Sequence, residues 1–200
     1  MAPENSFPTF SFPPDPVSYI CPTWDQLEQL TLQVAQNVLK SQDQPEIIVT
    51  LAKGGWPMTR SLADFLQVDE IASIGVKFYA GIHQRLPEPQ IYQDLPIDVA
   101  GKRLLLFDDV ADSGGSLKFV SDLLAERNAA SVTMATLFYK THSSVKPDFY
   151  VATTDAWIIF PFEKKEMSQL LREKWRAQSI SPTETESRLK HMGIALPRDL

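Results

Sequence analysis

The sequence has one cysteine, three histidines and no long apolar run, and each shortage excludes a class of protein. Cys21 has no second cysteine with which to form an intramolecular disulfide. One cysteine with three histidines also falls short of the usual structural zinc sites. No stretch of about eighteen apolar residues occurs, so no membrane-spanning helix is expected. The N-terminus lacks a basic segment followed by an apolar one, so no secretory signal is expected.

Basic residues are also in short supply, because 19 Lys and Arg stand against 25 Asp and Glu, a formal net charge of −6. This balance disfavours a general basic surface for nucleic acid, so we expect no nucleic-acid partner. With 200 residues, 44% of them hydrophobic, the chain can bury a full core without covalent cross-links. A cytoplasmic enzyme or ligand-binding domain remains as the expectation.

Proline content and hydrophobic spacing divide the chain into three segments. Residues 1–16 contain five prolines and are expected to form a proline-rich tail. The tail is either disordered or loosely docked, or its phenylalanines clamp it onto the domain or onto a second subunit. Residues 17–165 alternate helix-like and strand-like segments, which predicts an α/β domain with a mostly parallel, doubly wound sheet. Within it, prolines and glycines interrupt residues 79–101, which predicts a mobile loop, with a small hairpin as the alternative. Residues 166–200 are predicted to be a C-terminal helical extension.

Two capping patterns predict where helices begin. Thr23, with Gln26 three residues later, is a suitable N-cap for a first helix. Ser181 and Glu184 form the same pattern around a proline at the first helical position, and Gly193 suits the position just past that helix's end.

The segment from Leu104 to Ser116 carries the clearest chemical signal. An apolar strand leads into the adjacent carboxylates Asp108 and Asp109, then a glycine-rich turn and a helix. The turn, residues Asp112, Ser113, Gly114, Gly115 and Ser116, offers backbone N–H groups, hydroxyls and a helix N-terminus, which together suit a phosphate monoester. The carboxylates suit a vicinal diol or a hydrated Mg²⁺. The segment therefore predicts a sugar-phosphate ligand, and it is not a P-loop because no lysine follows the glycines.

This segment, Leu104–Leu117, resembles the phosphoribosyl pyrophosphate (PRPP) binding motif of type I phosphoribosyltransferases. The resemblance covers roughly residues 20–165 and implies that family's α/β sheet with a small hood, whereas the C-terminal helices are expected from the sequence pattern alone. It also implies that Asp108 and Asp109 hold the ribose diol and its Mg²⁺, and that Asp112 through Ser116 hold the 5-phosphate.

The strand Ile47–Leu51 ends in a second candidate, Ala52-Lys53-Gly54-Gly55. In the family, the matching loop binds pyrophosphate through backbone amides and a basic side chain, and it often contains a non-proline cis peptide. The resemblance therefore assigns pyrophosphate binding to Lys53 and Gly54. Taken alone, the short motif is equally typical of an ordinary turn.

The third candidate consists of Lys140, Trp157 and Ile158. These residues are similar to the base-binding residues of the family's 6-oxopurine branch, especially those of the xanthine-guanine enzymes. By that likeness Lys140 donates to the 6-oxo atom, Trp157 stacks on the purine, and backbone groups beside Ile158 read the base edge. The lysine ammonium can only donate hydrogen bonds, so it favours a base with a keto oxygen over a base with an amino group at the same position. The alternatives are a core tryptophan and a solvated lysine. Glu163 is a candidate for a second metal site, for recognition of the 2-position, or for simply starting a helix.

The resemblance implies an enzyme that displaces pyrophosphate from PRPP with a purine nitrogen, with Asp112 as the catalytic base and Mg²⁺ as the metal. Family members commonly form homodimers, so a homodimer is expected. Two alternatives remain open: a PRPP-binding regulatory protein without catalysis, and transfer to another base, such as orotate, uracil or adenine.

Overall fold

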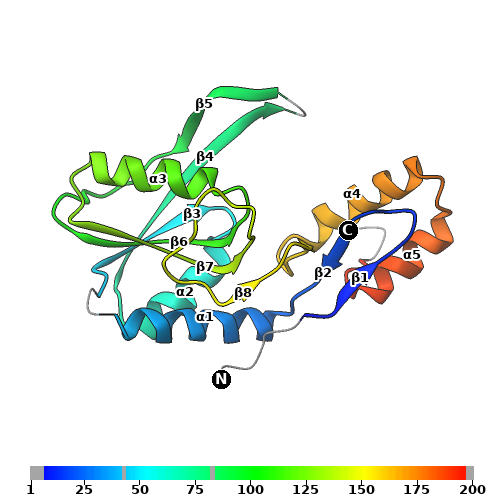
Figure 1. Cartoon of the computed structure of the whole chain (residues 1–200), viewed down its shortest axis with the longest axis horizontal. Helices are drawn as coiled ribbons and strands as arrows, with labels where there is room; N and C mark the ends of the chain where they lie inside the picture. Colours follow the sequence, from blue (N-terminus) through cyan, green and yellow to red (C-terminus); the bar gives the residue numbers. More distant parts are fainter. Residues whose placement is uncertain (1–6, 42–43, 82–83, 197–200) are drawn as a thin grey trace. The chain divides into compact units, whose positions relative to one another are not determined.

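The computed structural model describes residues 7–41, 44–81 and 84–196, and they fall into two compact units (Figure 1). The central unit is residues 28–154, and the terminal unit combines the described parts of residues 1–27 and 155–200. These boundaries differ from the segment boundaries predicted from the sequence, because both ends of the chain belong to one unit.

The central unit is built on a six-stranded sheet in the order β5-β4-β3-β6-β7-β8. Its strands are β3 (Ile47–Ala52), β4 (Glu70–Gly81), β5 (Gln84–Gln93), β6 (Arg103–Ala111), β7 (Ser131–Tyr139) and β8 (Ala152–Thr153). Only β4 and β5 pair antiparallel, and every other neighbouring pair is parallel. The predicted α/β class with a mostly parallel sheet is therefore confirmed.

Helices cover both faces of this sheet. Helix α3 (Gly115–Glu126) lies on one face, and α2 (Trp56–Leu66) lies on the other with most of α1 (Trp24–Leu39) (Figure 1). Alternate residues of β3 and β6 pack with Leu117, Val120 and Leu124 of α3 in one buried cluster. Because side chains alternate across a strand, the apolar runs of β3 and β6 supply both faces, as expected of a buried parallel sheet.

The prediction that residues 79–101 lack regular secondary structure was wrong. The end of β4 and the whole of β5 form an antiparallel hairpin there, the alternative that the sequence left open. Prolines lack a donor for sheet pairing, but β5 is an edge strand with one neighbour, where they are tolerated. The predicted mobility of this segment stays a prediction.

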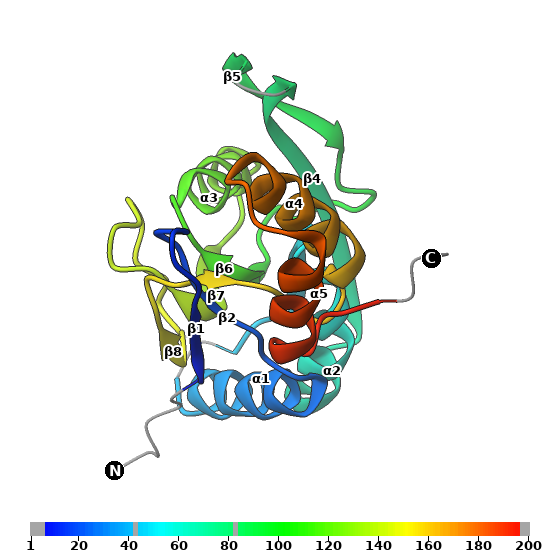
Figure 2. The ribbon, with the colours of Figure 1, turned by 90° about the vertical axis from the view of Figure 1, so that its right-hand side faces the viewer.

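The terminal unit joins a small sheet to two helices (Figure 2). Strands β1 (Thr9–Ser11), β2 (Ser18–Ile20) and β9 (Trp157–Ile158) form the sheet, and α4 (Lys164–Ala177) and α5 (Pro182–His191) follow. Strand β9 therefore belongs to this small sheet and not to the central one. In the part of the chain that the structure describes, no helix combines the length and apolar character needed to cross a bilayer.

The described part of the predicted tail is docked. Phe10 and Phe12 pack against the buried cluster of this unit, and Phe12 contacts the Trp175 ring edge-to-face. Residues 1–6 of the predicted tail lie outside the described residues. The clamping alternative is therefore the correct one for residues 7–16.

Asp15 fixes this docking through a buried polar network. Its Oδ1 accepts from the Lys174 ammonium at 2.8 Å, and its Oδ2 accepts from Tyr19 Oη at 2.6 Å and Trp175 Nε1 at 2.8 Å. Burial by itself would raise the pKa of Asp15, but the bonds from Lys174, Tyr19, the Val17 N–H and Trp175 outweigh it and lower the pKa to about 2. The network therefore ties the N-terminal segment to α4.

Both predicted helix starts are confirmed by their hydrogen bonds. The Thr23 hydroxyl accepts from the Gln26 N–H at 3.2 Å while Gln26 Oε1 accepts from the Thr23 N–H at 2.8 Å. Ser181 Oγ accepts from the Glu184 N–H at 3.2 Å, and Gly193 adopts a positive φ of 70° after α5. These local signals identified the helix ends because capping depends on neighbours in sequence.

Candidate active site

Three neighbouring strands deliver the candidate residues to one edge of the central sheet. Strands β3, β6 and β7 are adjacent and parallel, so their carboxyl ends meet there. Lys53 follows β3, Asp112 follows β6 and Lys140 follows β7. Crevices beyond such strand ends are where α/β sheets bind ligands.

The two adjacent carboxylates lie within β6 rather than after it. Strand β6 continues to Ala111, and Asp108 pairs with Thr136 of β7. Strand β3, by contrast, pairs with β6 only as far as Phe107. The acids therefore sit where β6 is no longer paired with β3, at the sheet edge bordered by the loop after β3.

The two acids strongly affect each other. The Asp109 N–H donates to Asp108 Oδ1 at 3.0 Å, and Asp109 is only 9% exposed. Burial and then the negative charge of Asp109 raise the pKa of Asp108 well above its usual range. A cation or hydroxyl donors placed here would relieve this repulsion.

The chemistry of the pair fits Mg²⁺. Carboxylate oxygens are the ligands that Mg²⁺ prefers, and it commonly uses one or two of them together with water and substrate phosphates. Among residues 7–41, 44–81 and 84–196, no cluster of three or more His, Cys, Asp or Glu offers a cage made entirely by the protein. Asp108 and Asp109 are thus suited to a metal that is shared with a substrate.

The loop after β3 packs directly against the second acid. A Cβ added to Gly54 would stand 2.6 Å from Asp109 Oδ1, and one added to Gly55 would stand 2.4 Å from Thr50 Oγ1. The Ala52–Lys53 peptide bond is cis, as the resemblance led us to expect. The two glycines therefore let this loop approach Asp109 and Thr50 more closely than a residue with a side chain would without a shift of its neighbours.

The turn before α3 has the geometry of an anion site. Gly114 adopts φ of 80°, which favours glycine, and it is the N-cap of α3, while the Gly115 N–H donates to Ser113 Oγ at 3.4 Å. A Cβ on Gly114 would also meet Ser143 Oγ at 2.6 Å. The hydroxyls of Ser113 and Ser116 flank these amides in sequence. No acidic residue stands in the first turn of α3, so the helix N-terminus favours an anion.

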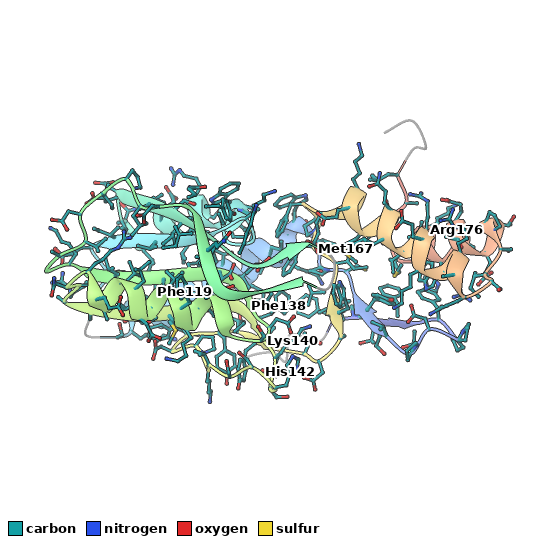
Figure 3. The ribbon with its side chains drawn as sticks, turned by 90° about the horizontal axis from the view of Figure 1, so that it is seen from above. Phe119, Phe138, Lys140, His142, Met167 and Arg176 are labelled. Carbon is teal, nitrogen blue, oxygen red and sulfur yellow. The ribbon has the colours of Figure 1, made fainter. Side chains whose placement is uncertain are left out.

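Two side chains from the segment after β7, those of Lys140 and His142 (labelled in Figure 3), approach Asp112. Its Oδ1 lies 3.3 Å from Lys140 Nζ and 3.1 Å from His142 Nε2. The Lys140 side chain is 9% exposed, whereas that of Asp112 is 53% exposed. The solvated-lysine alternative is therefore wrong, and Lys140 and Asp112 lie together as a site would require.

Sequence reasoning missed His142 and Ser144. Ser144 donates both its N–H, at 3.0 Å, and its hydroxyl, at 2.8 Å, to the Ser113 carbonyl. Neither residue belongs to a helical or alternating pattern, and only their closeness in sequence to Lys140 could have drawn attention to them.

The remaining candidates belong to the terminal unit. Trp157 is 48% exposed, so the core-tryptophan alternative is wrong, while Ile158 is buried. Glu163 accepts from the Phe160 N–H at 3.2 Å, just before α4. Burial raises the pKa of Glu163 despite that bond, and the charge of Glu166 adds to the rise. The roles expected of these residues in base and metal binding stay predictions.

Comparisons with known proteins agree with this geometry. The family model described as the phosphoribosyl transferase domain matches residues 23–166. A xanthine-guanine phosphoribosyltransferase of Gluconobacter oxydans is 28% identical over 152 residues, covering 75% of this chain and 88% of that protein. A hypoxanthine-guanine phosphoribosyltransferase of Mycoplasma genitalium is 32% identical over 110 residues, covering 54% and 61%. The solved purine phosphoribosyltransferase from Pyrococcus horikoshii has a TM-score of 0.65 at 30% identity, covering 72% of this chain and 93% of that one.

Proposed function

The chain belongs to the phosphoribosyltransferase family, and from this premise we propose that it transfers the phosphoribosyl group of PRPP to a 6-oxopurine, releasing pyrophosphate, in purine salvage. The observation that carries the proposal is the meeting of three groups at one sheet edge: the paired acids of β6, the anion-binding turn before α3, and the buried Lys140 beside Asp112. The first two groups suit PRPP and the third suits a keto base. The relatives named as acting on xanthine, guanine or hypoxanthine support the choice of base.

PRPP binding follows from charge and shape. The N–H groups of the turn and the hydroxyls of Ser113 and Ser116 would hold the 5-phosphate, and Asp108 and Asp109 would accept from the ribose hydroxyls. The Lys53 ammonium and the amides near Gly54 would hold the pyrophosphate. Mg²⁺, when bound by Asp108 and Asp109 together with PRPP, would neutralise negative charge on the substrate oxygens.

Base recognition and proton transfer belong to Lys140 and Asp112. The Lys140 ammonium has only donors, so it would bond the 6-oxo oxygen and reject the amino group of adenine. A nitrogen of the imidazole ring forms the bond to C1′ as the bond from C1′ to pyrophosphate breaks, and pyrophosphate leaves with the electron pair. The ring proton passes to the Asp112 carboxylate, which acts as the general base. Trp157 is proposed to stack on the purine.

Pyrophosphate release with each base in turn tests this proposal. The protein is incubated with PRPP and Mg²⁺ and with hypoxanthine, guanine, xanthine, adenine, uracil or orotate. Release with at least one 6-oxopurine and none with adenine is the expected result. PRPP binding is followed in parallel by calorimetry. Binding without release for any base would favour a regulatory protein, and release with adenine would contradict the role of Lys140.

The expected homodimer is checked by the mass of the protein in solution.

A further inference from the structure

We propose that His142 is a positioning residue for the reaction: its ring Nε2–H holds Oδ1 of Asp112, so that the other carboxylate oxygen is turned to the base. The inference rests on the proposed function, in which Asp112 receives the purine proton. It starts from the 3.1 Å separation of His142 Nε2 and Asp112 Oδ1.

The two oxygens of Asp112 are not equivalent. Oδ1 is hydrogen-bonded to His142 Nε2 at 3.1 Å and forms an ion pair with the Lys140 ammonium at 3.3 Å. In the part of the chain that the structure describes, no residue bonds Oδ2 of this exposed carboxylate. Two donors on one oxygen fix the rotation of the carboxylate and leave Oδ2 for an incoming N–H. Held in this way, the general base needs less reorganisation when the purine arrives.

His142 is presented to Asp112 by a fixed backbone. The Ser143 N–H donates to the Lys140 carbonyl at 2.9 Å, and Ser144 donates twice to the Ser113 carbonyl. His142 therefore lies inside a hydrogen-bonded turn from Lys140 to Ser143, and the residue after that turn is tied to the Ser113 carbonyl beside Asp112. Although the histidine ring is 58% exposed, its attachment point is held by these bonds.

Lys140 cannot perform the same task during turnover. Once a 6-oxopurine binds, the Lys140 ammonium is needed at the 6-oxo oxygen, which draws it from Asp112. His142 has no such second duty in the proposed mechanism. It therefore remains as the donor that keeps Asp112 oriented in the complex with the base.

The histidine must carry its proton on Nε2 to act in this way. A carboxylate only accepts, so the bond requires either the Nε2–H tautomer or the protonated ring. A glutamine at this position has a side-chain amide that can donate to Asp112 Oδ1 over a similar distance, and this amide does not titrate. Alanine removes the donor altogether.

Steady-state kinetics of His142→Ala and His142→Gln test the proposal, with Thr141→Ala as the neighbouring control. We expect His142→Ala to lower kcat about tenfold, as the loss of one hydrogen bond to a charged group would, with KM for PRPP and Tm little changed. His142→Gln should recover kcat to within about threefold, and Thr141→Ala should match the wild type. In an Asp112→Asn background, His142→Ala should have almost no further effect, because the two residues act together. An unchanged kcat in His142→Ala, or a full additional loss in the double variant, would overturn the inference.

A spectroscopic measurement separates this inference from the proposed function. Long-range ¹H–¹⁵N spectra report the tautomer of each ring, and the three histidines are assigned with the help of His142→Gln. At a pH where the ring is neutral, His142 should hold the Nε2–H form in the wild type and lose that preference in Asp112→Ala. An Nδ1–H form in a protein that turns over 6-oxopurines would overturn the inference and leave the function standing. Absence of turnover with every base, alongside the Nε2–H form, would overturn the proposed function and with it the catalytic role of His142.

Discussion

Replacing Gly54 with alanine should displace the carboxylate of Asp109 and impair PRPP use without unfolding the chain. The added methyl would lie 2.6 Å from Asp109 Oδ1, whereas ordinary contact begins at 3.4 Å. The carboxyl group must therefore retreat by 0.8 Å, the difference of these two distances. Displacements of about 1 Å within a reacting site cost about 100-fold in rate, so kcat/KM for PRPP should fall by about that factor.

The backbone at Gly54 does not oppose the change. Gly54 is not among the described glycines with positive φ, so alanine is compatible with its conformation. Gly101 provides the converse control, because it has φ of 72° and nothing within 4 Å of an added Cβ. Gly101→Ala should cost about 1 kcal/mol of stability and leave kcat/KM unchanged.

The assay combines kcat/KM for PRPP with thermal unfolding for both variants. We expect Gly54→Ala to lose activity out of proportion to its change in Tm, and Gly101→Ala to lose Tm without activity. Wild-type kcat/KM in Gly54→Ala would show instead that activity does not depend on the position of the Asp109 carboxylate.

Three further predictions concern single side chains. Asp112→Asn should lower kcat by about 100- to 10,000-fold, as loss of a general base does, while calorimetry finds PRPP affinity nearly unchanged. Lys140→Met should raise KM for hypoxanthine at least tenfold and reduce discrimination against adenine, as measured by pyrophosphate release. Because the folded-state pKa of Asp15 is about 2 against an ordinary 3.8, its contribution to stability is complete above about pH 4 and lost as the pH falls towards 2. Hydrogen exchange of the terminal unit should show this loss, of about 2 kcal/mol, in the wild type and not in Asp15→Asn.

Local chemistry explains why much of the site could be predicted. The turn from Asp112 to Ser116, with the paired acids before it, combines backbone, hydroxyl and carboxylate requirements in consecutive residues. Sequence order alone therefore brings them together, and parallel strands then bring Lys53 and Lys140 to the same edge.

The rest depended on contacts between residues distant in sequence. The β5 strand contains prolines that argue against a strand, and only its edge position next to β4 makes them acceptable. The hydrogen bond between Asp15 and Lys174 joins residues 159 positions apart, so no local sequence pattern could have predicted it. The His142 bond to Asp112 is likewise a product of the β6 and β7 pairing, not of a motif.

The most direct test of the central claim is a competition among bases in one reaction. The protein is mixed with PRPP, Mg²⁺ and equal concentrations of hypoxanthine, guanine, xanthine and adenine, and the nucleotide products are identified by mass. We expect one or more 6-oxopurine nucleotides, no adenine nucleotide, and an initial rate of product formation at least about 100-fold lower in Asp112→Asn. Adenine nucleotide among the products, or product formation at the wild-type rate by Asp112→Asn, would contradict the claim.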